Sequence, residues 1–238
     1  AAEQGAELVC LPEHFALLGL KDTDKLAIRE PWGRGPLQDA MRALARECQL
    51  WLVGGTLPIE IPGVDTQAYN TLAVWNPQGD CVARYDKIHL FGFSRGQESY
   101  DESRTILAGD TPAVLDTSGL RIGLSVCYDL RFPELYRAFS PVDMIFVPSA
   151  FTATTGRAHW ETLLRARAIE NLAYVVAPAQ GGVHTNQRAT WGHSMIIDPW
   201  GEILDRKLKG PGIVIANLDH QRIADIRESL PALAHRKL

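Results

Sequence analysis

A cysteine near the end of an apolar segment is the residue best suited to nucleophilic chemistry. Residues 120–127 form an apolar run that ends at Cys127, and Pro133 is well placed to begin a helix shortly afterwards. Cys127 is therefore expected at the carboxyl end of a strand, near helix amides that favour a thiolate and an oxyanion. A strand cysteine is more often an apolar filler, and this alternative stays open here, as it does for the other three cysteines.

Two charged residues follow other apolar runs and could share the same end of the sheet. Glu13 comes directly after the strand predicted over residues 8–11, and Lys87 precedes a loop rich in glycine and polar residues. Each charge, taken alone, is more often a solvated surface group. Sequence spacing does not decide between these two interpretations.

The elements that must position these side chains follow an α/β pattern. Short apolar runs alternate with longer amphipathic stretches, as expected when helices cover buried strands. Helices are predicted over 36–49 and 159–172, and turns over 76–80 and 198–202 indicate antiparallel hairpins. The predicted strands are 8–11, 50–56, 71–75, 122–127, 144–148, 174–178, 194–197 and 212–216. We expect one domain that spans residues 1–238.

Composition narrows the class of partner. The chain has 238 residues, 46% of them hydrophobic and 22% charged, and a net charge of -4. It carries no long basic run, so nucleic acid and anionic membranes are not expected as partners, and a small molecule is. The four cysteines show no C-x-x-C pair and no zinc-type spacing, so we expect no disulfide framework, no metal and a cytoplasmic location.

The length of the apolar stretches and the first six residues bear on membrane insertion and on what precedes this chain. No stretch approaches the roughly 18 apolar residues of a membrane-spanning helix. Residues 1–6 read as the end of a helix with a glycine stop, and the chain opens without Met. We therefore expect upstream sequence, including any targeting segment, to be missing from this chain.

Three separated segments together carry a family resemblance. They are LPEHF around Glu13, RYDKIHLF around Lys87 and GLSVCYDLRFPELYR around Cys127. In this order they resemble the nitrilase, or carbon-nitrogen hydrolase, superfamily, and the resemblance spans nearly the whole chain. A second glutamate of the family matches Glu102, whose Glu-Ser-x-Thr context favours it over Glu98.

The later part of the chain is similar to one branch of this superfamily. The segments PSAFTATTGRAHWETLLRARAIENLAYVVAPAQGGVH and RATWGHSMIIDPWGEIL resemble the amidases that hydrolyse deaminated glutathione, with the omega-amidases as near neighbours. The resemblance implies a four-layer α-β-β-α sandwich that forms a homodimer or a higher oligomer. It also implies that the first strand and most of the first helix would precede Ala1.

The implied reaction is hydrolysis of a small carboxamide through a thioester, with release of ammonia and a carboxylic acid. Cys127 would attack, Glu13 would act as base for the thiol and later for water, and Lys87 would stabilise the oxyanion with the backbone amide of Tyr128. Glu102 would orient Lys87 or the substrate amide. No metal or organic cofactor is required.

Three further residues are candidates for binding a substrate carboxylate. Arg131 could form a bidentate pair with it, although an ion pair with Glu134 is an equally good interpretation. Thr154 and Thr155 could supply hydroxyl groups, or they could cap a turn. His159 is expected to be structural, because no second histidine lies at ligand spacing.

Other reactions remain as alternatives. A serine hydrolase is disfavoured because residues 123–127 lack the second glycine of a G-x-S-x-G motif. A redox thiol would need no Glu13 or Lys87, but no resolving cysteine is near. A non-catalytic carboxylate-binding module is also possible if the site has decayed. Within enzymes, a true nitrilase or an N-carbamoyl amine hydrolase is the runner-up.

Overall fold

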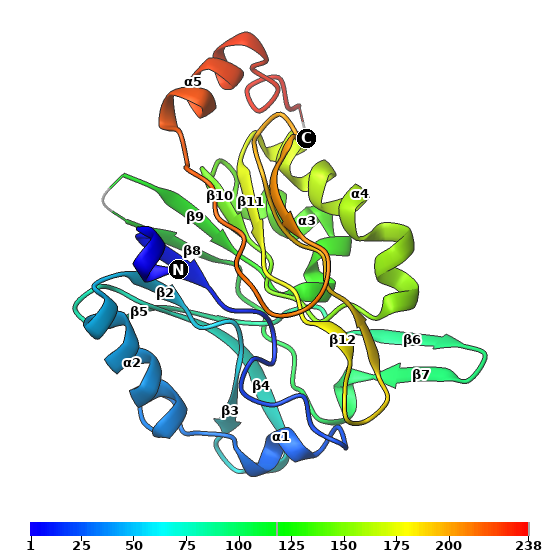
Figure 1. Ribbon diagram of the computed structural model, residues 1–238. Coiled ribbons are helices and arrows are strands. Elements are labelled where there is room, and N and C mark those ends of the chain that lie inside the picture. The colour runs from blue at the N-terminus through cyan, green and yellow to red at the C-terminus, as the bar shows by residue number, and fades with distance from the viewer. Residues whose placement is uncertain (118, 238) are drawn as a thin grey trace.

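Two β-sheets lie face to face between helices (Figure 1). The computed structural model describes residues 1–117 and 119–237. Helix α2 (Pro36–Cys48) packs on the outer face of one sheet, whereas α3 (Pro133–Phe139) and α4 (Ala153–Asn171) cover the other. The layers therefore follow the order α-β-β-α, which confirms the predicted fold class.

The first sheet contains the strands that precede Glu13 and Lys87. Its order is β1-β2-β4-β3, with β5 also paired to β4. Strands β1 and β2 run parallel, and the other pairs are antiparallel. Its strands are β1 (Leu8–Cys10), β2 (Trp51–Val53), β3 (Leu57–Ile61), β4 (Val64–Trp75) and β5 (Cys81–Asp86).

The second sheet carries the cysteine candidate. Its order is β15-β14-β11-β10-β9-β8, and the three central strands β9, β10 and β11 run parallel. Its strands are β8 (Ala113–Asp116), β9 (Arg121–Leu124), β10 (Met144–Phe146), β11 (Tyr174–Ala177), β14 (Ser194–Ile197) and β15 (Ile203–Lys207).

Two small hairpins project on the same side of the molecule (Figure 1). They are formed by β6 (Gly92–Arg95) with β7 (Glu98–Asp101) and by β12 (Gly181–Val183) with β13 (Ala189–Trp191). The remaining helices are α1 (Asp24–Ala27) and α5 (His220–Ser229). Across the described residues, no helix is both long enough and apolar enough to cross a membrane.

Alternation along β4 explains why the first sheet is covered on both faces. Leu72 and Val74 are fully buried between the two sheets. Ala73 and Trp75 point to the opposite face and pack with Met41 of α2. Because successive side chains of a strand point to opposite faces, one apolar run supplies both interior layers.

Helix α4 covers the second sheet through one apolar stripe. Trp160, Leu164 and Ala168 recur at a spacing of four and are fully buried. The helix begins at Ala153, six residues before the predicted start, because the Thr152 side chain accepts a hydrogen bond from the amide of Thr155. This cap explains how weak helix formers come to occupy the first turn.

Most predicted strands are present, but their bounds differ and one prediction is wrong. The strand predicted over 122–127 ends at Leu124, and β4 extends back to Val64 through half-exposed residues. Residues 212–216 form no strand. The amide of Ile215 donates instead to the Asp205 side chain, so the apolar run there is not part of a backbone ladder.

Candidate active site

Cys127 lies at the start of a tight turn just beyond strand β9. The 3-10 turn Cys127–Arg131 begins there, and the amide of Cys127 donates to the carbonyl of Pro148 at 3.0 Å. The φ angle of Cys127 is 51°, in the left-handed region that a residue with a side chain rarely adopts. Such strained residues cluster at functional sites. The geometry thus holds the buried thiol in a fixed direction at the carboxyl end of the sheet.

Glu13 reaches the same place from the other sheet. It follows strand β1, and only 2% of the residue is exposed. Its Oε2 accepts from the amide of Ala150 at 2.8 Å, and its Oε1 accepts from Lys87 Nζ and Asn70 Nδ2, both at 3.0 Å. A buried carboxylate with three donors has little freedom to rotate. Its orientation is therefore set by both sheets.

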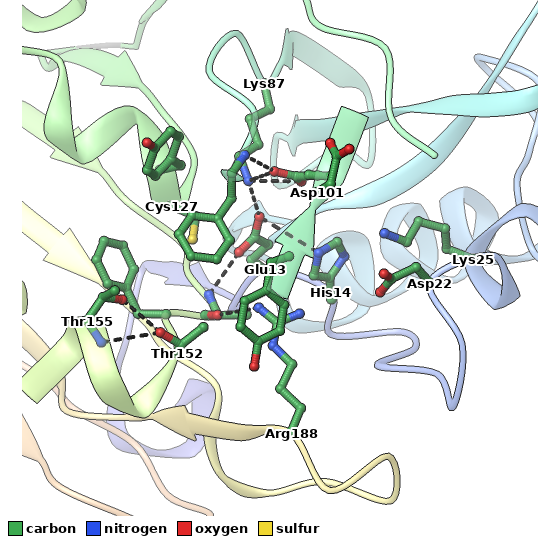
Figure 2. A pocket seen from close by; sticks show the side chains of 16 residues that line it. Glu13, His14, Asp22, Lys25, Lys87, Asp101, Cys127, Thr152, Thr155 and Arg188 are labelled. Atoms are coloured by element: carbon green, nitrogen blue, oxygen red, sulfur yellow. Dashed lines mark hydrogen bonds and ion pairs between the residues drawn. The ribbon is translucent and has the colours of Figure 1, made fainter. Parts of the chain in front are cut away.

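Lys87 is the cation at the centre of the site. It lies directly after strand β5, and 2% of it is exposed. Its Nζ donates to Glu13 at 3.0 Å (Figure 2). It also donates to Glu102 Oε2 at 2.7 Å. One ammonium group therefore bridges two carboxylates.

Glu102 is held by the backbone around it as well as by the lysine. It opens the 3-10 turn Glu102–Arg104 after β7, and its Oε2 accepts from the amide of Phe91 at 2.8 Å. Asn70 of β4 donates to Glu102 at 3.3 Å as well as to Glu13, so one buried amide spans both acids. Sequence reasoning missed Asn70, which lies in the polar first half of β4, just before the apolar run that predicted a strand.

The charges of this cluster reinforce one another. Burial alone would lower the pKa of Lys87, but Glu102 and Glu13 outweigh it and hold that pKa well above its ordinary value. Burial alone would raise the pKa of Glu13, but Lys87 and other neighbours lower it to about 2. Burial and the neighbouring Glu13 raise the pKa of the Cys127 thiol. At neutral pH Lys87 is therefore an ammonium, Glu13 a carboxylate and Cys127 a neutral thiol.

His14 lies beside Glu13 and is neutral at physiological pH. Burial lowers the pKa of its imidazole to about 4, although Glu13 opposes the shift. Its Nε2 lies 3.8 Å from Glu13 Oε1. Ligand atoms of Glu13, His14 and Glu102 lie within 4.8 Å of one another, as a metal site would require. Lys87 already contacts both of these carboxylates, so the chain itself supplies the cation at this place.

A cavity opens onto this cluster, and its wall includes two further cations. Cys127, Glu13, Lys87 and Glu102 all line it, so the structure brings the four residues together although they lie far apart in sequence. Lys25 and Arg188 approach the cavity from different sides (Figure 2). Sequence reasoning missed both, because the one-turn helix α1 that carries Lys25 and the hairpin that carries Arg188 are too short to show a pattern of their own.

The predicted substrate-binding residues divide into two groups. Tyr128 and Thr155 line the cavity, whereas Arg131 and Thr154 are not among its lining residues. Thr155 lies in the first turn of α4, where its hydroxyl is 2.9 Å from that of Thr152, the N-cap residue, which also lines the cavity. Thr154 donates its hydroxyl proton to Glu98 at 3.0 Å.

Arg131 occupies a position that neither interpretation of the sequence anticipated. Its Nη1 lies 3.3 Å from His159 Nδ1, and its guanidinium lies over the rings of Tyr128 and Phe151. Among the ion pairs of the described residues, none joins Arg131 to Glu134. A role for Arg131 in binding the substrate carboxylate stays a prediction, and its guanidinium contacts two rings that line the cavity.

Comparison with known proteins identifies the family of this chain. A profile described as carbon-nitrogen hydrolase matches residues 1–228. The chain belongs to the carbon-nitrogen hydrolase family. Its fold is correspondingly close to that of a solved relative, the NitFhit protein of C. elegans. The two share 38% identity with a TM-score of 0.90, over all of this chain and 58% of that one, so this chain spans little more than half of NitFhit.

Two curated relatives of this carbon-nitrogen hydrolase differ in the substrate that their names state. A deaminated glutathione amidase of Synechocystis sp. is 45% identical over 99% of this chain and 88% of the relative. The human omega-amidase NIT2 is 37% identical over all of this chain and 85% of the relative. These similarities confirm the predicted family and support an amidase.

Proposed function

We propose that this carbon-nitrogen hydrolase is a cysteine-dependent amidase in which Glu13, Lys87 and Cys127 form the catalytic triad and Glu102 assists. One observation carries the proposal: a buried ammonium is clamped between two carboxylates beside a strained cysteine, and all of them line one cavity. Acyl transfer from an amide needs a nucleophile, a base and a cation that stabilises the oxyanion, and it needs them oriented toward one another and shielded from water.

In the acylation step, the Cys127 thiol attacks the amide carbon while Glu13 takes its proton. Because the pKa of the thiol is raised and Glu13 is ionised, this proton moves during the attack rather than before it. Lys87 stabilises the oxyanion together with the amide of Tyr128, which lies in the first turn of a 3-10 segment where backbone donors lack intrahelical partners. Glu13 then protonates the departing nitrogen.

Deacylation reuses the same groups in reverse. The released amine leaves room beside Glu13, where water enters and gives a proton to the carboxylate as it attacks the thioester. The carbon–sulfur bond of the tetrahedral intermediate then breaks, and Glu13 returns the proton to the Cys127 sulfur as the carboxylic acid is released. Glu102 keeps Lys87 charged and in place through both steps, since its Oε2 is fixed by the amide of Phe91. No metal or organic cofactor is needed for this cycle.

The proposed substrate is deaminated glutathione, on the strength of the similarity to an amidase of that name. Its scissile group is a secondary amide, so the nitrogen product is cysteinylglycine. The expectation of ammonia holds only for a primary amide. An omega-amidase acting on the primary amide α-ketoglutaramate is the second candidate, which the similarity to the human omega-amidase favours.

A substrate panel tests the proposal directly. Purified protein is incubated with deaminated glutathione, α-ketoglutaramate, a neutral primary amide, a nitrile and an N-carbamoyl amine, and products are followed by mass spectrometry. We expect hydrolysis of amides, with the highest kcat/KM for deaminated glutathione, and none by a Cys127→Ala variant. Preferred turnover of α-ketoglutaramate would assign the omega-amidase activity, and turnover of the nitrile or N-carbamoyl compound alone would contradict an amidase.

The remaining expectations concern the whole protein. We propose that residues 1–238 form one catalytic domain, that the chain assembles as a homodimer or higher oligomer, and that it works in the cytoplasm with a small amide as its partner. All four cysteines are free, which suits a reducing compartment. Sedimentation at several protein concentrations tests the assembly, since a mass that stays at 26.3 kDa would contradict it.

A further inference from the structure

Lys25 is a half-buried cation without a partner in the cavity wall. It lies on the one-turn helix α1, and its ammonium makes no hydrogen bond or ion pair with any residue that the structure describes. Burial lowers its pKa, although Glu102 and Asp22 act in the opposite direction. An unpaired charge removed from water is costly, so an anion that arrives in the cavity would relieve that cost.

Arg188 is a second such cation, supplied by another part of the chain. It lies in the β12–β13 hairpin, and no carboxylate of the described residues pairs with it. Its Nη2 donates to the carbonyl of Ala150 at 3.1 Å, and its guanidinium lies 5.0 Å from the ring centre of Tyr100. Its Nε is buried and has no hydrogen-bond partner in the described structure.

The fixed side of Arg188 leaves the rest of the guanidinium available. One nitrogen is anchored on Ala150, whose amide binds Glu13, so Arg188 is positioned relative to the proposed base. The ring of Tyr100 supports the guanidinium further. A guanidinium that is positioned but not neutralised is well suited to a carboxylate, which accepts two parallel hydrogen bonds from it.

We propose that Lys25 and Arg188 bind two different carboxylates of one substrate, so that the enzyme selects an amide with an anionic group on each side of the scissile bond. This inference rests on the proposed amidase function and specifies its substrate class. Figure 2 shows the two side chains apart from each other, which suits two carboxylates better than one. Deaminated glutathione has a carboxylate at each end, whereas α-ketoglutaramate has only one.

Four amides of matched length separate the two subsites. N-succinylglycine has both carboxylates, N-ethylsuccinamate has only the one on the acyl side, N-butyrylglycine has only the one on the amine side, and N-ethylbutyramide has none. Released amine is measured as kcat/KM for each. With the wild type we expect each carboxylate to raise kcat/KM on the order of 30-fold, as suits a charged hydrogen-bonded pair.

Variants then assign the carboxylates. Each of the variants Lys25→Met and Arg188→Met should abolish the increase in kcat/KM that one carboxylate gives and keep the increase that the other gives. The carboxylate affected should differ between the two variants. The readout is the ratio of kcat/KM for a charged amide to that for N-ethylbutyramide, because a folding defect lowers both values and leaves the ratio unchanged. Arg188→Lys keeps the charge but loses the fork, so we expect an intermediate ratio.

Two exposed cations serve as matched controls. Lys21 precedes α1, and Arg157 lies on the exposed face of α4; neither lines the cavity. Lys21→Met and Arg157→Met should leave all four kcat/KM values unchanged. If these controls alter the ratios as strongly as the cavity variants do, the effect comes from overall charge and the inference is overturned.

The possible outcomes distinguish this inference from the proposed function. Equal kcat/KM for all four amides in the wild type would overturn the two-carboxylate inference while the amidase proposal stands. Loss of the same carboxylate's advantage in both variants would mean that the two cations share one anion, which also overturns it. If none of these amides, deaminated glutathione and α-ketoglutaramate is hydrolysed, the amidase proposal itself fails.

Discussion

Cys127 is prepared for attack by the base beside it and not by prior ionisation of its thiol. Its pKa is raised by burial and by Glu13, so the resting thiol keeps its proton. Glu13 stays ionised because Lys87 and its other neighbours lower its pKa. The reactive state is therefore a neutral thiol beside a carboxylate, which avoids placing two adjacent anions in a buried site.

Removal of the thiol tests this interpretation most directly. Cys127→Ala should lower kcat at least about 1,000-fold, because the covalent route is lost. The free energy of unfolding should change by about 1 kcal/mol or less, since only one small side chain is removed. Urea unfolding and steady-state kinetics measure both. Cys81→Ala, at an exposed cysteine, is the control and should keep full activity.

The pH dependence should be flat where a histidine base would titrate. The pKa of Glu13 is lowered to about 2 and that of His14 to about 4, whereas the pKa values of Cys127 and Lys87 are raised. On a neutral amide, kcat/KM should therefore vary little between about pH 5 and about pH 8. A full inflection near the ordinary histidine pKa would assign the base to an imidazole instead.

The role of Glu102 should be measurable through the pKa of Lys87. Glu102→Gln removes a carboxylate that raises the pKa of Lys87, so that pKa should fall. Loss of the charged oxyanion partner should then appear as an alkaline limb of kcat/KM that begins at lower pH than in the wild type. Glu98→Gln, at the nearby competing glutamate, should leave the profile unchanged. An identical shift in both variants would remove the assignment of Glu102.

At the scale of elements, a buried aspartate joins the lysine segment to the cysteine turn. Asp129 is fully buried and accepts from the hydroxyl of Tyr85 at 2.7 Å and from the amide of Val126 at 2.8 Å. Its other oxygen accepts from the amide of His89 at 3.0 Å. One carboxylate thus fixes the residue before Cys127 and the segment after Lys87 in one register.

Asp129→Asn tests this coupling with almost no change in size. One amide nitrogen would face donors in place of a carboxylate oxygen, so we expect unfolding to become easier by about 2 kcal/mol. We also expect kcat to fall although Asp129 does not line the cavity. Thermal unfolding and kinetics measure the two effects. A fall in stability with unchanged kcat would make Asp129 a structural residue only.

The strand-end rule explains how much of the site was predictable. Glu13 and Cys127 each come shortly after an apolar strand, so local pattern sufficed to mark both as candidates, but the two strands belong to different sheets and the pattern did not predict how these sheets face each other. Their assignment to one site still needed the family resemblance. Lys25 lies on the one-turn helix α1 and Arg188 in the β12–β13 hairpin, and nothing in their sequence neighbours distinguishes them from solvated charges.

Arg131 illustrates the opposite difficulty. Its place four residues after Cys127 correctly predicted that it lies near the site, but not the direction of its side chain. That direction is set by the rings of Tyr128 and Phe151, and Phe151 comes from a different loop. The alternation of strands and helices was predictable, because burial imposes a local pattern of apolar residues on each element. The polar hairpins that line the cavity show no such pattern.

At the scale of the whole molecule, the site exists only when the two sheets are docked. Glu13 and Lys87 follow strands of the first sheet, and Cys127 follows a strand of the second. The core between the sheets therefore supports function as well as stability. Weakening this core should therefore lower the free energy of unfolding and, with it, the urea concentration at which activity is lost.

Leu72→Ala tests this dependence. Leu72 is fully buried between the sheets, so truncation should lower the free energy of unfolding by about 3 kcal/mol. Activity should then be lost at a lower urea concentration than in the wild type, together with the fluorescence change. Leu204→Ala, at an exposed leucine, should leave the free energy of unfolding within about 0.5 kcal/mol of the wild type. Equal effects of both changes would contradict the importance of the inter-sheet core.

The lysine held between two carboxylates has a consequence for the total charge of the site. Before attack, Glu13, Glu102 and Lys87 sum to one negative charge beside a neutral thiol. When the proton moves to Glu13 and the oxyanion forms, the sum is again one negative charge. The attack therefore moves charge over a few ångströms within the site, and the net charge of the site stays the same. Dissolved ions respond to net charge, so the chemical step on a neutral amide should proceed at nearly the same rate in dilute and in concentrated salt.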